Sequence, residues 1–343
     1  MRLLAFLACA SAPPGEVTIY ARDAGGYTIA PREVPALEDP RRVSGELGTV
    51  RHGGRFAKGD EGPYTGGRAL DVRYVVQDGV GVPLDQEGLL LWSFYAHLAS
   101  ARDALTERGL DVSPIFPVDI AWNPAVSPLI ELSPADNAAY AIGSNLFLLL
   151  PDGDDREVPL LANEGVVVHE LGHAVFHLLT RGDPTASPLV ADASTEAGMW
   201  QASMHEAFAD ALATLLLDEP RFMDPSIDMP ARWVDANAVL TDALLPSAGS
   251  GDATAALLYD PYPLGSVFAS AVWDVRVDLD DRDRALALLF RAVEAWAPRG
   301  GSDLDGARFL AAWVEAADEE ERAYVCRAIH FRMDGVLTAE GCP

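Results

Sequence analysis

The sequence predicts an α+β protein, and three observations carry that prediction. Short runs rich in β-branched and aromatic residues lie between residues 17 and 150. Longer segments with helical periodicity begin at residue 86 and dominate after residue 163. Apolar residues make up 49% of the chain, which is enough for a globular core. A run of strands followed by a run of helices is typical of the α+β class.

Residues 15–80 are predicted to form a loose β-rich segment that packs on the rest of the protein. This stretch is rich in Gly, Pro and Arg and contains β-like runs at residues 17–20 and 72–76. A long helix with a broad apolar face is expected over residues 86–108. Further strands, separated by Pro and Asn, are expected at 118–122, 139–142 and 146–150.

The next predicted helix contains the pattern His-Glu-x-x-His. Asn163 is placed as its N-cap, and Gly182 follows its last residue. His169 and His173 are four residues apart, so their imidazoles lie on one face, about 6 Å apart along the helix axis. That spacing lets both reach one zinc ion. Glu170 flanks the metal without binding it, where a base must sit to deprotonate a zinc-bound water.

A hydrolytic zinc site needs a third protein ligand and one open position. His177 lies about 12 Å from His169 along the same helix axis, too far for one ion. Glu206 and Asp210 are the better source, because they share one face of a predicted helix over residues 203–217. Glu206 can complete the zinc site, and Asp210 can accept a hydrogen bond from His169. The alternatives are a solvated acidic face for this pair and a chance pattern in the histidine helix.

The two motifs together resemble the gluzincin metallopeptidases of the thermolysin and fungalysin kind. In this chain His-Glu-x-x-His is followed, on a later helix, by Glu-x-x-x-Asp. The resemblance implies that His169, His173 and Glu206 bind zinc. It implies Glu170 as the general base and Asp210 as the residue that orients a ligand. It also implies a zincin-like catalytic domain with a mixed sheet beside the active-site helices, followed by a mostly helical lobe.

Two further site residues come from the same resemblance. The stretch from Tyr259 to Asp274 is similar to a fungalysin segment that begins with a histidine, which stabilises the oxyanion in that family. Here the matching position is near Tyr262, whose hydroxyl can donate the same hydrogen bond. In gluzincins a strand just before the zinc helix pairs with extended substrate. The segment from Asn145 to Leu150 is placed to bind substrate in this way, with a plain buried strand as the alternative.

The charge balance argues against a nucleic-acid partner. Asp and Glu number 52 against 25 Lys and Arg, which gives a net charge of −27 that phosphate groups would repel. No apolar run reaches the ~18 residues that a membrane helix needs. We expect a peptide or protein substrate, and the sequence leaves the oligomeric state open.

The first 14 residues resemble a short export signal, because one arginine precedes an apolar run that ends in small residues. The segment ending at Cys9 resembles a bacterial lipobox, which would make this cysteine a lipid-modified membrane anchor. We therefore expect export to the bacterial cell envelope or beyond it, with an uncleaved N-terminus as the alternative. Outside the cytosol Cys326 and Cys342 can form a disulfide, whereas in the cytosol they would be free thiols.

These predictions divide the chain into a leader over 1–14, the β-rich segment over 15–80, a catalytic lobe over 81–220 and a mostly helical lobe over 221–343. Three helices are expected between residues 283 and 333.

The first functional hypothesis is a zinc-dependent endopeptidase. The second is a catalytically weak relative that keeps zinc for structure and acts as a cell-envelope binding protein, because the family's histidine is missing. A metal-free protein with an accidental motif is the third.

Overall fold

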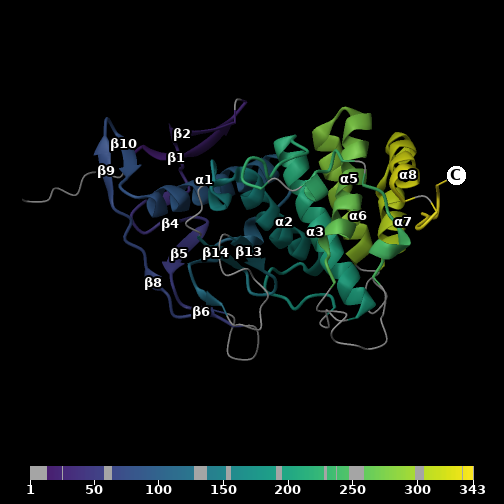
Figure 1. Cartoon of the computed structure of the whole chain (residues 1–343), viewed down its shortest axis with the longest axis horizontal. Helices are drawn as coiled ribbons and strands as arrows, with labels where there is room; N and C mark the ends of the chain where they lie inside the picture. The colour runs from purple at the N-terminus through teal and green to yellow at the C-terminus, as the bar shows by residue number, and fades with distance from the viewer. Residues whose placement is uncertain are drawn as a thin grey trace, which may run out of the picture.

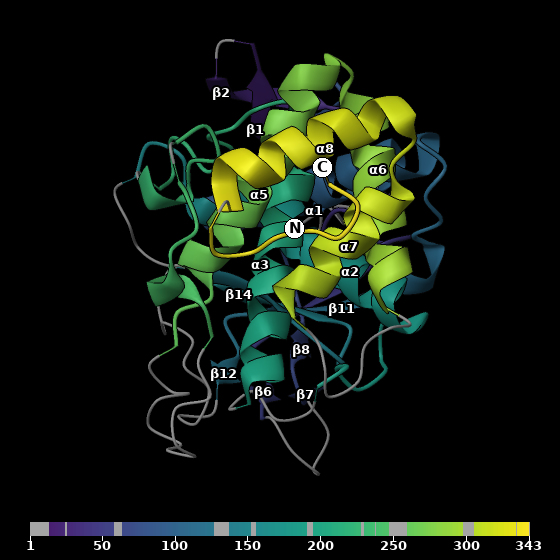
Figure 2. The same cartoon turned by 90° about the vertical axis from the view of Figure 1, so that its right-hand side faces the viewer.

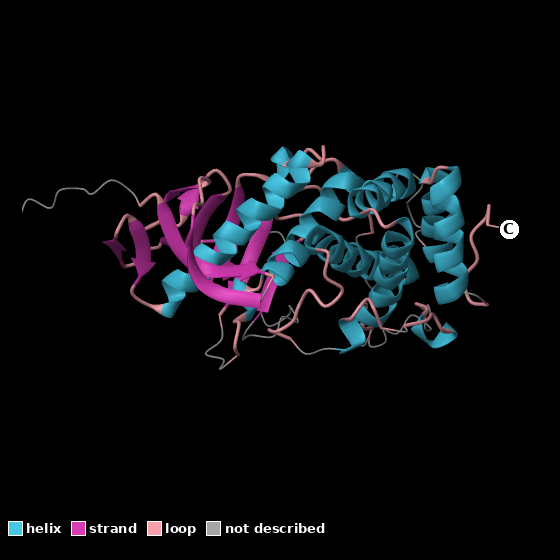
Figure 3. Ribbon diagram, turned by 90° about the horizontal axis from the view of Figure 1, so that it is seen from above, coloured by secondary structure: helices cyan, strands magenta, loops and turns pink. Residues whose placement is uncertain are grey.

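The computed structural model describes residues 14–24, 26–57, 64–126, 137–151, 156–190, 195–227, 230–236, 238–246, 259–297, 305–333 and 335–342. The strands gather at one end of the molecule and the later helices at the other (Figures 1 and 3). The predicted α+β class is confirmed. Cys9, the predicted lipid attachment site, lies outside the described residues. None of the helices in the described ranges has the length and apolar character needed to cross a membrane.

The N-terminal part of the chain contributes to three sheets. The first has the strand order β2-β1-β10-β9, with β1 (Glu16–Asp23), β2 (Gly26–Arg32), β9 (Tyr74–Gln77) and β10 (Val80–Pro83). The third is small and has the order β12-β6-β7, with β6 (Arg55–Phe56), β7 (Tyr64–Thr65) and β12 (Ala125–Val126). These short strands follow the Gly- and Pro-rich composition of this region, which limits the length of each run.

The second sheet is mixed and runs beside the helices that carry the two sequence motifs. Its order is β13-β14-β11-β5-β4-β3, and β8 also pairs with β5. Its strands are β3 (Leu37–Asp39), β4 (Ser44–Gly45), β5 (Gly48–His52), β8 (Arg68–Ala69), β11 (Val118–Trp122), β13 (Asn137–Ala141) and β14 (Leu146–Leu150). Because β5 pairs in parallel with β11, the predicted β-rich segment and the predicted catalytic lobe share this sheet.

The proposed role of the segment from Asn145 to Leu150 in pairing with substrate is wrong. All five residues of β14 are buried, and the strand pairs with β13 on one side and β11 on the other. Both of its edges are therefore occupied, and β13 is the terminal strand of the sheet. The Asn145 side chain donates to the Ile115 carbonyl at 2.8 Å and accepts from the Tyr140 hydroxyl at 3.1 Å, so it holds the turn before β14.

Helix α1 (Gln86–Glu107) connects the first two sheets to the later helices. The Asp85 carboxylate caps it by accepting the N–H of Gly88. The buried Trp92 indole donates to the Pro40 carbonyl at 2.8 Å, and the Ser93 hydroxyl accepts the N–H of Tyr20 in β1 at 2.9 Å. Both bonds fasten α1 to segments that precede it by about fifty residues or more.

The remaining elements are mostly helical, as the sequence predicts. They are the 3₁₀ turns η1 (Ser113–Ile115), η2 (Leu160–Ala162), η3 (Pro230–Arg232) and η4 (Asp242–Leu244), and the helices α2 (Glu164–Arg181), α3 (Glu196–Leu217), α5 (Tyr262–Leu279), α6 (Arg282–Trp296), α7 (Gly306–Ala316) and α8 (Glu319–Met333). The last three correspond to the three helices expected between residues 283 and 333. A disulfide joins Cys326 of α8 to Cys342, the predicted pair, and fastens the C-terminal segment to that helix.

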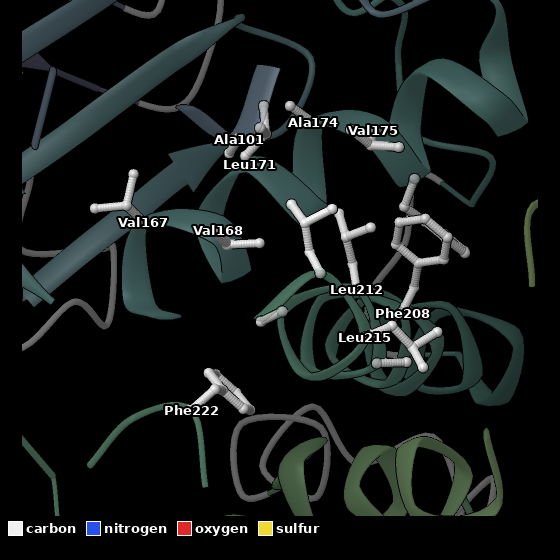
Figure 4. Close-up of a cluster of buried hydrophobic side chains, with 14 of the residues drawn as sticks. Ala101, Val167, Val168, Leu171, Ala174, Val175, Phe208, Leu212, Leu215 and Phe222 are labelled. Carbon is white, nitrogen blue, oxygen red and sulfur yellow. The ribbon is translucent and has the colours of Figure 1, made fainter. Parts of the chain in front are cut away.

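Helices α2 and α3 pack closely against each other, and their apolar side chains fill the space between them. Figure 4 shows this cluster, which includes Leu171 and Val175 of α2 and Phe208 and Leu212 of α3. Gly172 makes the close approach possible, because a Cβ atom at this position would lie 2.7 Å from the Cα of Ala209. The contact between Gly172 and Ala209 sets how closely α2 and α3 can approach each other.

A buried histidine in α1 predicts that the free energy of unfolding depends on pH. His97 of α1 is 4% exposed, and burial lowers its pKa to about 4. In the unfolded chain a histidine titrates near pH 6.5, so the unfolded state binds more protons between pH 6.5 and 4. Stability supplied by neutral His97 is therefore present above pH 6.5 and is lost as the pH falls toward 4.

We expect a His97→Gln variant to lose less stability than the unchanged protein over this pH range, by about 2 kcal/mol. Urea unfolding at pH 7 and pH 4.5 would measure the difference for both proteins. Equal losses in the two proteins would show that His97 does not contribute to the pH dependence.

Candidate metal centre

Helix α2 is held at both ends by the residues that the sequence predicted. The Asn163 carboxamide oxygen accepts the N–H groups of Gly165 and Val166, and its nitrogen donates to the Met223 carbonyl at 2.9 Å. Gly182 ends the helix in the left-handed conformation, with φ of 71°. The Tyr27 hydroxyl of β2 donates to Asn163 Oδ1 at 3.0 Å and accepts the N–H of Glu164 at 2.7 Å. Contacts from β2 and from the loop at Met223 thus fix the start of this helix.

Three predicted metal-binding side chains meet where α2 crosses α3. The Nε2 atoms of His169 and His173 are 3.2 Å apart. Glu206 places Oε2 at 3.4 Å from Nε2 of His169 and Oε1 at 3.7 Å from Nε2 of His173. Donors at about 2.1 Å from a tetrahedral zinc ion are about 3.4 Å from one another. The observed separations therefore fit one such ion.

The charges at this point favour a bound cation. Burial raises the pKa of Glu206, but the two histidines outweigh it and lower the pKa overall, so the carboxylate is ionised. Burial lowers the pKa of His169, yet Asp210 and Glu206 raise it to about 10. The field of these carboxylates therefore attracts positive charge. Burial lowers the pKa of His173 to about 4, which leaves its imidazole neutral and able to bind a metal.

An unsatisfied acceptor gives a second reason for a cation. Glu206 Oε2 is buried and accepts no hydrogen bond from a described residue, although Nε2 of His169 and Nη2 of Arg232 lie 3.4 and 3.7 Å away. A buried carboxylate oxygen without a donor is costly, and a metal ion at the point between the three side chains would satisfy it. Two imidazoles and one carboxylate are a donor set that zinc accepts in hydrolytic sites, so the residues present fit zinc.

Glu170 lies beside the three donors in the position expected of a base. One of its carboxylate oxygens lies within 4.8 Å of donor nitrogens of His169 and His173. Its Oε2 accepts the backbone N–H of Tyr140 in β13 at 2.7 Å, which orients the carboxylate. Burial raises the pKa of Glu170 to about 7. A carboxylate that titrates near neutrality can both take and return a proton.

Asp210 lies behind His169 and connects it to a cation that the sequence analysis missed. Asp210 Oδ1 is 2.9 Å from Nδ1 of His169, and the carboxylate is fully buried. Arg232 in η3 donates to both Asp210 oxygens, at 3.0 Å from Nε and 2.5 Å from Nη2. This arginine stands in a Pro- and Asp-rich stretch with no periodic pattern. The only signal for it was that a buried carboxylate requires a positive partner.

Tyr262, the first residue of α5, lies next to this group. The guanidinium carbon of Arg232 is 4.3 Å from the centre of the Tyr262 ring, which is the distance of a cation–π contact. The Glu206 carboxylate, followed by burial, raises the pKa of the Tyr262 hydroxyl, so the group stays protonated and can donate. The side chain is 41% exposed and thus accessible from the solvent side.

Helix α5 reaches this position because Gly265 lacks a side chain. A Cβ atom there would lie 2.9 Å from the Cβ of Glu206 and 3.1 Å from the Ser203 carbonyl oxygen. The Ser203 hydroxyl and the Tyr259 hydroxyl, 2.6 Å apart, hold the residues just before the helix against α3. The start of α5 is therefore fixed directly over Glu206.

His177, which the sequence analysis excluded as a metal ligand, has its Nε2 atom 2.8 Å from the Ala186 carbonyl oxygen.

Comparisons with known proteins bear on the fold. The chain matches no protein-family model, and no curated protein is similar to it in sequence. A solved structure described as the precursor of protealysin, a metalloproteinase from Serratia proteamaculans, matches with a TM-score of 0.53 and 14% identity, over 84% of this chain and 86% of that one. The fold is zincin-like. Within this zincin-like fold the His-Glu-x-x-His helix supplies a group of side chains that can hold a metal ion.

Proposed function

We propose that the protein is a zinc-dependent endopeptidase. The observation that carries this proposal is the convergence of donor atoms from His169, His173 and Glu206, at separations of 3.2 to 3.7 Å, beside the carboxylate of Glu170. The fold of this chain is similar to that of a protein described as a metalloproteinase precursor. This similarity supports peptide-bond hydrolysis as the reaction.

Each side chain has a distinct part in that reaction. Zinc, when bound, supplies a Lewis acid for the scissile carbonyl and the attacking water. Glu170 takes a proton from the water and passes it to the leaving amine. The Tyr262 hydroxyl donates to the oxygen that gains negative charge. Asp210 fixes the ring of His169, and Arg232 holds Asp210 in place while its guanidinium stacks on Tyr262.

Strand β13 is the best placed element to bind an extended peptide. It is the terminal strand of its sheet, and the N–H of Tyr140 points away from β14 toward Glu170. Alternate residues of a strand direct their backbone groups to the same edge, so Ala138 also presents its N–H and C=O on the outer side. A substrate strand paired with the outer edge of β13 would lie beside the proposed catalytic side chains.

The proposed location is the bacterial cell envelope or the exterior. The leader-like first residues, with Cys9 as a candidate lipid attachment site, motivate this proposal. The disulfide between Cys326 and Cys342 supports it, because such bonds persist in oxidising compartments and are rare in the cytosol.

Casein degradation tests the proposed activity. We expect the purified protein to contain about one zinc per chain and to degrade casein. A chelator should stop degradation, and added zinc should restore it. A protein that holds zinc but degrades neither casein nor a peptide library would favour the second function, a zinc-stabilised envelope binding protein. The absence of a histidine between Tyr259 and Asp274 is the observation that motivates that alternative.

A further inference from the structure

The first sheet lies at one end of the molecule and turns one of its faces away from α1. Figure 1 shows β9 and β10 at that end, while α7 and α8 lie at the other end, which Figure 2 views directly. The opposite face packs on α1, because the rings of Tyr74 and Trp92 are in contact, with centroids 5.4 Å apart. A Cβ atom at Gly81 would also lie 3.4 Å from the Trp92 ring. Side chains that alternate with Tyr74 and Gly81 therefore point away from α1.

This outer face carries large apolar side chains. Val75 pairs with Val82 across β9 and β10, and the ladder continues where the Leu84 N–H donates to the Arg73 carbonyl, so Val75, Val82 and Leu84 share the face. The register of β1 and β2 places Ile29 on it as well. Leu84 is 56% exposed, Ile29 58% and Val75 38%. The second face of a sheet that packs on a helix is ordinarily polar, so these side chains mark a contact surface.

Charge is distributed unevenly along the chain. Residues 15–83, which contain the whole first sheet, carry 9 basic and 10 acidic side chains. Residues 84–343, which contain the helices, carry 15 basic and 42 acidic side chains and so account for the net charge of −27. An anionic bilayer repels acidic groups that come within a Debye length of it, about 8 Å at physiological salt. The first sheet is therefore the end of the molecule that such a surface repels least.

The proposed lipid at Cys9 would hold the same sheet close to a membrane. Glu16, the first residue of β1, follows Cys9 by seven residues. An extended chain covers at most about 3.6 Å per residue, so β1 would begin within about 25 Å of the bilayer surface. The tether therefore ends at the sheet that carries the exposed apolar face and little net charge.

We propose that the outer face of the first sheet, formed by Ile29, Val75, Val82 and Leu84, rests on an anionic phospholipid bilayer. This inference depends on the lipid at Cys9 that the proposed location includes. The apolar side chains enter the headgroup region, and the acidic helical end points away from the bilayer. The helices α2 and α3, which carry the metal centre, lie between the two ends (Figure 1), so substrates reach the centre from the aqueous phase.

Two fluorescent labels on the full, lipidated chain test this orientation. Cys326 and Cys342 form a disulfide and Cys9 would carry lipid, so Leu84→Cys supplies a single free thiol. Phe331→Cys on α8 is the matched control, because Phe331 is 59% exposed at the opposite end. Each protein is reconstituted into vesicles of phosphatidylethanolamine and phosphatidylglycerol that contain a headgroup nitroxide. We expect the nitroxide to remove most of the fluorescence of the label at position 84 and none of that at position 331.

Two added carboxylates test the face itself. Ile29→Asp combined with Val75→Asp places negative charge on the outer face, and each charge near an anionic surface changes the contact equilibrium about fivefold. Quenching of the Leu84→Cys label should therefore fall. The control pair, Val239→Asp with Val277→Asp, adds the same charge at exposed positions outside the first sheet and should leave the quenching unchanged. Undiminished quenching in the first pair would overturn the proposal, because another face would then be in contact.

Mass spectrometry of the N-terminal peptide separates this inference from the proposed membrane anchor. In a protein that carries lipid on Cys9, equal quenching of the Leu84→Cys and Phe331→Cys labels, or quenching of neither, would overturn the orientation alone. An N-terminal peptide without lipid would overturn both the anchor and the orientation that depends on it.

Discussion

Replacement of Glu170 by glutamine is expected to abolish peptide hydrolysis and to leave zinc binding intact. The amide oxygen of glutamine can still accept the N–H of Tyr140, so the side chain keeps its position. It cannot take a proton from water at neutral pH. Loss of a general base typically lowers turnover about 10²- to 10⁴-fold. The rate on a quenched fluorescent peptide and the zinc content of the purified protein would be measured together.

A second glutamate on the same helix supplies the control. Glu164 lies in the first turn of α2 and faces His97, away from the donor atoms. Glu164→Gln removes one charge from the same element and should leave turnover within about threefold of the unchanged protein. Undiminished turnover in Glu170→Gln would exclude Glu170 as the base. Loss of zinc from that variant would mean that the carboxylate also binds the metal.

The Glu206→Ala substitution is expected to weaken zinc binding by about a hundredfold or more. It leaves two imidazoles as the only protein ligands, and even partners that merely orient a ligand contribute about 10- to 100-fold to metal affinity. Glu196→Ala, in the exposed first turn of the same helix, removes an equal charge and should retain zinc. Competition with a chelating dye at pH 7.5 would give both affinities. Full zinc retention in Glu206→Ala would reject this residue as a ligand.

The helix that carries the histidines could be predicted almost to the residue, because its signals are local. Asn163 bonds to backbone N–H groups two and three positions later, and Gly182 provides the left-handed residue that ends the helix. The positions of His169 and His173 on one face follow from helical periodicity alone. None of these features depends on distant parts of the chain.

The order of strands in the sheet could not be predicted in the same way. Leu146–Leu150 is a run of apolar residues, and such a run looks the same in a central strand as in an edge strand. Its central place is set by pairing with β11 and β13, which the local pattern does not encode. Arg232 was missed for a related reason. Its partner Asp210 lies 22 residues away on another element, so only the folded chain brings the charges together.

The hydroxyl of Tyr27 has a consequence for any maturation of this protein. It is the acceptor for the first backbone amide of α2, and it reaches that amide from a hairpin near the beginning of the chain. A protease that removed residues up to the end of β2 would take away this acceptor and also the strand that binds Ser93. A shortened form that keeps both contacts therefore has to retain Tyr20 and Tyr27, and with them most of the β1–β2 hairpin.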